Sequence, residues 1–119
     1  MDRLNYFELE EFASPDLLGS GSKMSQHLLG MLDKARELAE TPFVVTSGFR
    51  TVKHNEKVGG SKTSSHLKGF AVDLACSDDR KRERMIYYLI ICGFQRIGIS
   101  KTFIHIDIDP TKHAAIWLY

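Results

Sequence analysis

Two long stretches of the chain carry apolar residues at spacings of three and four, which is typical of amphipathic helices. The first covers residues 24–39 and the second residues 77–92. Ser22 and Ser77 stand at their starts, and a serine side chain caps a helix by accepting a hydrogen bond from a free backbone N–H group. Gly93 follows the second stretch, where glycine commonly ends a helix. The pattern therefore predicts two main helices.

Shorter stretches rich in apolar, aromatic and β-branched residues predict strands. They cover residues 43–46, 70–74, 94–99 and 103–109. The last two are separated by three turn-forming residues, which predicts a hairpin, and the polar stretch 51–64 has no period and predicts a loop. Two main helices with strands that pair largely with their neighbours indicate an α+β fold, in which the helices pack on a small, mostly antiparallel sheet.

The size and charge of the chain narrow the classes of function. A length of 119 residues suits a single domain, which we expect to span residues 1–119. The formal net charge of +1 gives no reason to expect a nucleic-acid partner. The longest apolar run, residues 85–92, is too short to span a membrane. The first residues lack the apolar region of a signal peptide, so we expect a protein made in the cytoplasm, with a monomer as the simplest state.

One carboxylate interrupts an otherwise apolar predicted strand. Asp73 lies within the stretch 70–74, and burying a carboxylate is costly unless it is paired or coordinates a metal. His66 stands seven residues earlier, and Gly69 between them permits a turn that other residues resist. Imidazole and carboxylate groups are both good zinc ligands. Asp73 and His66 are therefore candidate metal ligands.

The predicted strand 103–109 contributes a second polar line. Because side chains alternate in direction along a strand, His105, Asp107 and Asp109 share one face while isoleucines take the other. If this strand lies beside the Asp73 strand, then His66, Asp73 and His105 converge on one metal ion. Three protein ligands and one open position describe a catalytic zinc site, so Zn²⁺ is the expected cofactor.

The run Ser-His-x-x-Gly-x-Ala-x-Asp from Ser65 to Asp73, with a downstream His-x-Asp at His105, resembles a known family. It is similar to the zinc-dependent peptidoglycan peptidases, which include D-alanyl-D-alanine carboxypeptidases, L-alanyl-D-glutamate endopeptidases and phage endolysins. Residues 44–50 and 54–60 are similar to the segment before that motif, and the likeness runs from about residue 6 to 110. The resemblance implies a hedgehog/DD-peptidase-like fold and hydrolysis of a stem-peptide bond by a metal-activated water. It also implies action on the cell wall after release, as for a phage lysin.

The resemblance also implies roles around the metal. Arg50 is expected to hold a substrate carboxylate or carbonyl, the alternative being a surface arginine paired with a nearby acid. Ser65 either caps a turn or hydrogen-bonds the substrate. The family usually carries an acid or histidine three positions before its last zinc histidine, but Thr102 stands there and cannot act as a base. Asp107 is the predicted replacement as general base, and its alternative role is to orient a metal ligand.

Two other functions compete with the peptidase. A non-catalytic zinc domain of the same fold, as in hedgehog signalling domains, would bind a cell-wall fragment or a protein partner, and Thr102 keeps this alternative open. A zinc-free structural domain is disfavoured by Asp73. Two further side chains have two interpretations each: Asp109 is structural or exposed, and Trp117 packs on the domain or lines the cleft.

Overall fold

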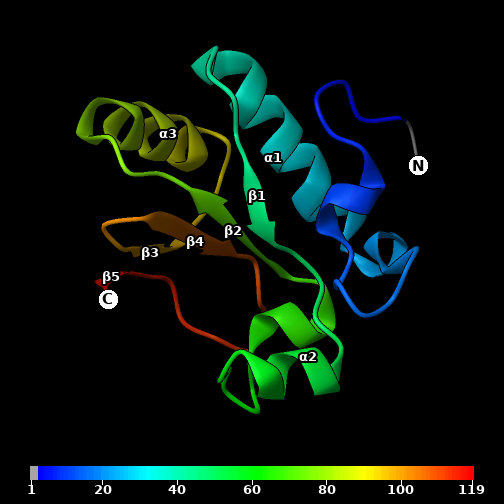
Figure 1. Ribbon diagram of the computed structural model, residues 1–119. Coiled ribbons are helices and arrows are strands. Elements are labelled where there is room, and N and C mark those ends of the chain that lie inside the picture. Colours follow the sequence, from blue (N-terminus) through cyan, green and yellow to red (C-terminus); the bar gives the residue numbers. More distant parts are fainter. Residues whose placement is uncertain (1–2) are drawn as a thin grey trace.

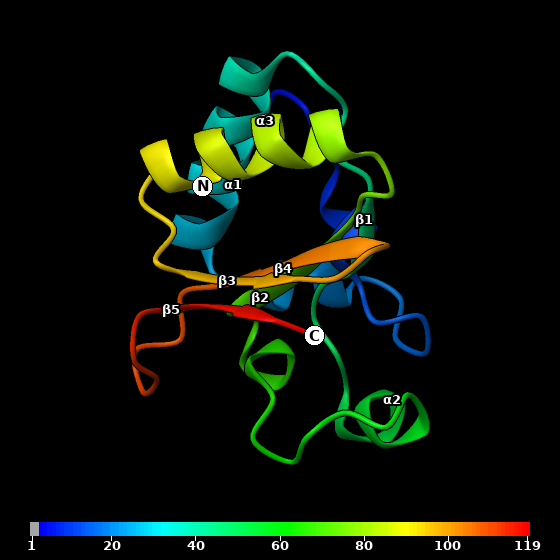
Figure 2. The same ribbon diagram turned by 90° about the vertical axis from the view of Figure 1, so that its left-hand side faces the viewer.

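The computed structural model describes residues 3–119 and shows a layer of helices on a layer of strands, with one short helix on the opposite side. Helices α1 (Gln26–Ala39) and α3 (Asp79–Ile91) lie against one face of a five-stranded sheet (Figures 1 and 2). A short helix, α2 (Val52–Lys57), lies on the other side of the sheet. The predicted α+β fold with two main helices is confirmed.

The sheet is mixed but largely antiparallel. Its strands are β1 (Val45–Ser47), β2 (Ala71–Ala75), β3 (Arg96–Ile99), β4 (Phe103–Asp107) and β5 (Ala115–Leu118). Its strands lie in the order β1-β2-β4-β3-β5, and all neighbours pair antiparallel except β3 and β5, which are parallel. Strands β3 and β4 form the predicted hairpin.

The alternation predicted for β4 decides which face of the sheet becomes the core. Ile104 and Ile106 are fully buried in the apolar cluster shared with α1 and α3. His105 and Asp107 point to the opposite face, because successive side chains of a strand alternate. The helices therefore seal one face of the sheet, and the polar residues stand on the face that α2 and its neighbouring loops approach.

Both predicted helix caps are wrong by one to three residues. Ser25 caps α1 instead of Ser22, because residues Ser20–Lys23 already form a 3₁₀ turn. Asp78 caps α3 instead of Ser77, with its carboxylate accepting a hydrogen bond from a first-turn N–H group. Serine and aspartate are near-equal caps, so composition alone does not distinguish adjacent candidates.

Regular structure occurs in the stretch 51–64, for which a loop was predicted, and in the tail, for which no element was predicted. The stretch 51–64 includes the six residues of α2, which Thr51 caps, and Asn55 is the one buried residue of that helix. The tail contains β5, whose residues are mostly exposed. Helix α2 buries almost nothing and therefore shows no hydrophobic period. Strand β5 did have a signal, the apolar and aromatic run of residues 114–119, although most of these side chains are exposed.

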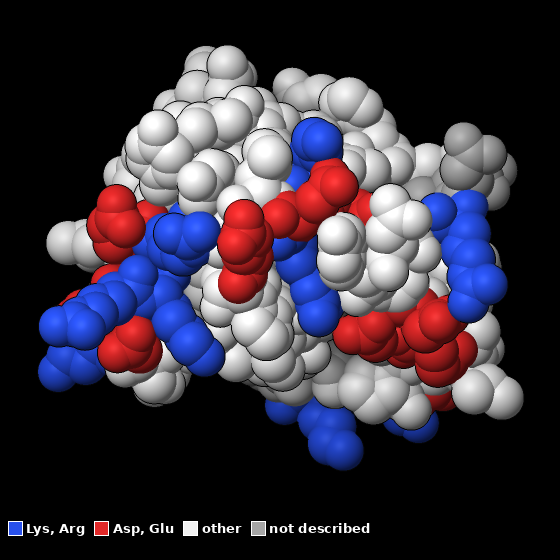
Figure 3. Space-filling view, turned by 90° about the horizontal axis from the view of Figure 1, so that it is seen from above, with Lys and Arg blue, Asp and Glu red and all other residues white. Residues whose placement is uncertain are grey.

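The surface over the helices carries both signs of charge. In Figure 3, Lys and Arg side chains gather near the start of α3, with acidic side chains among them. Arg82 pairs with Asp79 in this region. The mixture favours a solvated helix face. Cys76 and Cys92 are free thiols, and within residues 3–119 no helix has the length and hydropathy to cross a membrane.

Gly69 joins the 3₁₀ turn Ser65–Lys68 to β2, and an alanine there should destabilise the protein. Gly69 has a φ of +74°, and an added Cβ atom would overlap the backbone carbonyl of Lys23. The left-handed conformation alone costs about 1–2 kcal/mol for other residues. We expect Gly69→Ala to lower the free energy of unfolding in urea by at least that amount.

Gly30 offers the matched control for this variant. It lies inside α1, and an added Cβ atom would meet nothing within 4 Å. Gly30→Ala should raise the free energy of unfolding by about 0.5–1 kcal/mol, because alanine has the better helix propensity. Equal stability of the two variants would contradict the role given to Gly69.

Candidate metal centre

His66, Asp73 and His105 meet on the polar face of the sheet. Strands β2 and β4 pair so that Asp73 lies directly opposite His105, and the turn before β2 brings in His66. Asp73 Oδ1 lies 2.8 Å from His105 Nδ1 and 3.3 Å from His66 Nε2. One potential ligand atom from each residue lies within 4.8 Å of the other two. The three predicted ligands therefore form one cluster.

The donor set suits a small divalent metal. Tetrahedral ligands with bonds of about 2.0–2.1 Å have donor atoms about 3.4 Å apart, close to the 3.3 Å between Asp73 Oδ1 and His66 Nε2. Asp73 Oδ1 and His105 Nδ1 lie 2.8 Å apart and would have to separate slightly around a metal. Two imidazole nitrogens and a carboxylate oxygen suit zinc and related transition metals. The three side chains are largely buried but line a cleft of about 360 Å³, so a small molecule can reach them. The cluster is compatible with a metal site.

A backbone carbonyl fixes the ring of His66. His66 Nδ1 lies 2.8 Å from the carbonyl oxygen of Gly48, and a carbonyl only accepts, so Nδ1 carries the proton. The Nε2 lone pair is then free to face Asp73 and a metal. Gly48 is packed so closely that an added Cβ atom would lie 2.6 Å from the carbonyl oxygen of Phe12. The chain thus has to keep glycine where His66 is anchored.

Asp107 lies at the opposite edge of the His105 ring from Asp73. Its Oδ2 is 2.8 Å from His105 Nε2, and its Oδ1 accepts from Arg96 Nε at 2.7 Å and from the backbone N–H of Asp109 at 3.2 Å. Both oxygens of this buried carboxylate are therefore engaged, and the ring separates them from the cluster. A carboxylate behind a histidine is the usual device for orienting a metal ligand, so the geometry favours that role over a general base.

Arg50 contacts the same carboxylate that faces the two histidines. Its Nη2 donates to Asp73 Oδ2 at 3.4 Å, while Nε and Nη1 bind Ser47 and Asn55. The guanidinium thereby engages the second oxygen of Asp73 and leaves Oδ1 for the histidines. Arg50 also lines the cleft, so contact with substrate stays a prediction.

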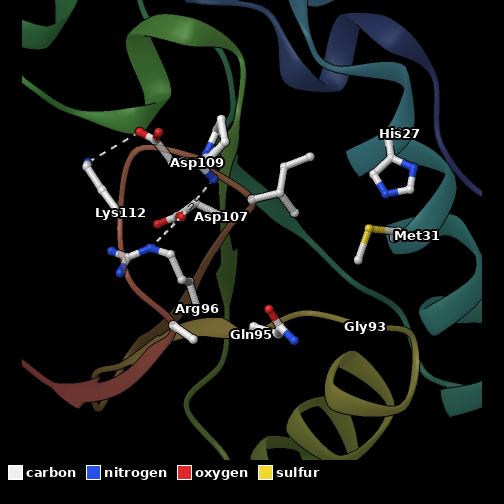
Figure 4. Close-up of a pocket in the computed structure, with 11 residues that line it drawn as sticks. His27, Met31, Gly93, Gln95, Arg96, Asp107, Asp109 and Lys112 are labelled. Carbon is white, nitrogen blue, oxygen red and sulfur yellow. Dashed lines mark hydrogen bonds and ion pairs between the residues drawn. The ribbon is translucent and has the colours of Figure 1, made fainter.

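A hydrogen bond between Ser65 and Asp109 connects the turn that carries His66 to the segment directly after β4. Ser65 Oγ donates to Asp109 Oδ2 at 2.7 Å and accepts from Lys112 Nζ at 2.8 Å. The Asp109 side chain is fully buried and ion-paired with Lys68 and Lys112. Figure 4 shows the contact with Lys112. Of the two interpretations of Asp109, structural or exposed, the structure supports the structural one. The hydroxyl of Ser65 is already engaged, and its predicted contact with substrate stays a prediction.

The sequence match agrees with this geometry. A model of the family described as Peptidase M15 matches residues 5–107. The chain belongs to the peptidase M15 family. The predicted resemblance to zinc D-alanyl-D-alanine carboxypeptidases and related peptidases is thereby confirmed, and membership supports a peptidase with a peptide substrate. A comparison with curated proteins returns no match.

The two carboxylates that flank the His105 ring, Asp73 and Asp107, both have lowered pKa values. Burial would raise the pKa of Asp73, but hydrogen bonds with His105 and His66 outweigh it and hold this pKa well below its usual range. Burial likewise opposes the lowered pKa of Asp107, which its bonds with His105 and Arg96 maintain. Burial would lower the pKa of His105, yet its bonds to Asp107 and Asp73 raise it. Both carboxylates are therefore ionised at neutral pH.

The hydrogen bonds and ion pairs of Asp109 should stabilise the protein less at acidic pH. Burial would raise its pKa, but hydrogen bonds from Thr111 and Ser65 and the charge of Lys68 hold it well below the ordinary value. A group with a lowered pKa in the folded state stabilises it fully above the unfolded-state pKa of about 4, and loses that contribution as pH falls. We expect the stability difference between wild type and Asp109→Asn to stay constant from pH 8 to 5 and to shrink below pH 4. A pH-independent difference in urea unfolding would contradict this.

Three partners of the site residues were missed by the sequence analysis. Arg96 holds Asp107, Lys112 holds Ser65 and Asp109, and the Gly48 carbonyl holds His66. Arg96 had a signal, because it alternates with the apolar Ile97 along β3 and so had to face the polar side. The Gly48 carbonyl had no signal in the sequence, since every residue carries a backbone carbonyl.

Proposed function

We propose that the protein is a zinc-dependent peptidase that hydrolyses a peptide bond in the stem peptides of bacterial peptidoglycan. The single observation that carries the proposal is the cluster of His66, Asp73 and His105 at the bottom of an accessible cleft. Membership of the M15 family supplies the peptidase chemistry. In the cell the protein acts on the wall after release, in the manner of a phage lysin.

Each proposed ligand presents a defined atom. His66 would hold the metal through Nε2, His105 through Nδ1 and Asp73 through Oδ1, because the other atoms of these side chains are engaged elsewhere. A bound zinc ion polarises a scissile carbonyl and lowers the pKa of a water molecule. Arg50 fixes the free oxygen of Asp73 and offers its positive charge to an anionic substrate. Asp107 orients His105.

One observation favours a second function. Of the residues among 3–119 that line the cleft, Asp73 and Asp107 carry carboxylates, and both carboxylates are engaged. Thr102, at the position where the family usually has an acid or histidine, is exposed and has no basic group. The alternative is therefore a zinc domain that binds a wall fragment or a protein partner without cutting it.

The test separates the two functions by turnover. The purified protein is loaded with zinc, its metal content is measured, and it is incubated with peptidoglycan of several chemotypes and with a synthetic stem pentapeptide ending in D-alanyl-D-alanine. One bound zinc with new amino groups over time supports the peptidase. Bound zinc without new amino groups on any substrate supports the binding domain, and a protein that binds no zinc overturns both.

A further inference from the structure

The cleft has an aromatic wall, made of Trp117 in β5, Tyr119 directly after it and Phe103 in β4. Strand β5 begins at Ala115, beyond residue 107, where the family match ends. Trp117 and Tyr119 therefore lie in a part of the chain that the family match does not cover, whereas Phe103 lies within it.

A missing side chain in β3 makes room for the wall. Gly98 pairs with His105 on one side and with Trp117 on the other, so it lies between the candidate ligand and β5. A Cβ atom on Gly98 would lie 2.7 Å from ring atoms of both Trp117 and Tyr119. The two rings thus lie over bare backbone beside the metal cluster. The Trp117 and His105 ring centroids are 5.5 Å apart.

The wall is continuous and held in place. The rings of Tyr119 and Phe103 are in contact, with centroids 5.0 Å apart, which extends the surface along the cleft. The Arg96 guanidinium lies over the Trp117 ring at 4.8 Å, and Arg96 is itself fixed by Asp107. Rigid aromatic rings give a large contact area at low cost in side-chain entropy.

Within β5, Trp117 faces the cleft and its neighbour Ile116 does not. Trp117 is half-buried in the cleft wall, whereas its neighbour Ile116 is 60% exposed and does not line the cleft. The rest of the cleft lining is polar and includes Arg50, Lys112 and Ser61. A peptide that carries both carboxylates and hydrocarbon side chains matches the two kinds of surface.

We infer that Trp117 and Tyr119 are specificity-determining residues, whose rings bind the hydrocarbon side of a peptide substrate at the metal cluster. The inference rests on the proposed function for the identity of the substrate. If the rings contact the substrate beside the bond that is cut, they increase the affinity of the enzyme for the substrate. Removing a ring should then change KM and leave kcat and zinc content nearly constant.

The first experiment measures this division of effects with the zinc-loaded enzyme and the stem pentapeptide. We expect Trp117→Ala to raise KM by roughly tenfold or more, the value of one lost apolar side-chain contact. Tyr119→Ala, which removes a largely exposed ring and so leaves folding intact, should also raise KM, while Tyr119→Phe retains the ring and the wild-type KM. Ile116→Ala on the same strand is the matched control and should leave KM unchanged.

The second experiment needs no turnover. Trp117 is the single tryptophan of the chain, so the intrinsic fluorescence of the protein reports on this wall. Titration of the zinc-loaded protein with the pentapeptide should give a saturable fluorescence change, with a midpoint that rises roughly tenfold in Tyr119→Ala and stays constant in Ile116→Ala.

The two experiments separate the inference from the proposed function. A fluorescence titration of this form without any turnover supports the wall and overturns the peptidase. Turnover with a KM that is the same in Trp117→Ala, Tyr119→Ala and Ile116→Ala supports the peptidase and overturns the wall. Absence of both signals overturns both.

Discussion

Asp73→Asn should remove the bound zinc and lower peptide hydrolysis by about three orders of magnitude or more. Asp73 Oδ1 is the atom that both histidines approach, and the substitution removes the negative charge that compensates a divalent cation. Polarisation by a bound metal is worth several kcal/mol, and each 1.36 kcal/mol corresponds to about tenfold in rate. Zinc content per protein chain and the release of amino groups from the pentapeptide measure the two effects.

The control for this variant is another aspartate with no role in the cluster. The side chain of Asp79 is fully exposed at the start of α3, so Asp79→Asn should keep one zinc and full turnover. A chelator should abolish turnover of the wild type, and added zinc should restore it, whereas zinc at the same concentration should not restore Asp73→Asn. An Asp73→Asn protein that keeps both its metal and its turnover would remove Asp73 from the ligand set.

The ligand cluster could be predicted because it follows from local rules. The period of two along β4 put His105 and Asp107 on one face before any pairing was known. Asp73 stood out because a carboxylate in an apolar strand demands compensation. The step that remained open was whether β2 and β4 are neighbours, and the register confirms it by placing Asp73 opposite His105.

The parts that escaped prediction depend on contacts between distant residues. The Gly48 carbonyl that anchors His66 looks like any other carbonyl in a sequence, although the two residues are 18 positions apart. Ser65 and Asp109 are 44 positions apart, and nothing in either local pattern names the other as its partner. Such pairs are set by the tertiary arrangement of the sheet and the turns.

The two missed elements differ in the signal that the sequence gives. Helix α2 buries Asn55 alone and so has no apolar spacing, whereas β5 lies in the apolar and aromatic run of residues 114–119, which is typical of a strand. This matters for function, because β5 and the residue after it supply Trp117 and Tyr119, two of the three rings of the aromatic wall. The sequence allows Trp117 either to pack on the domain or to line the cleft. In the structure its ring is partly buried and also lines the cleft.

Asp107→Ala distinguishes the two roles weighed for that carboxylate. If Asp107 orients His105, the variant should bind zinc about 10–100-fold more weakly, which is the usual effect of removing a ligand's outer partner. If it is the general base, zinc affinity should stay constant and turnover should fall by about 10²–10⁴-fold at every zinc concentration. A zinc titration followed by turnover at saturating metal measures both quantities on one sample.

We expect the first result, with most of the turnover recovered once zinc saturates the variant. Asp107 contacts the nitrogen of His105 that faces away from Asp73, and its other oxygen is held by Arg96. A carboxylate in that position cannot reach a substrate at the cluster without breaking both bonds. Wild-type zinc affinity combined with lost turnover would contradict this result. It would show that Asp107 is the general base, the role that the residue at the position of Thr102 usually has in the family.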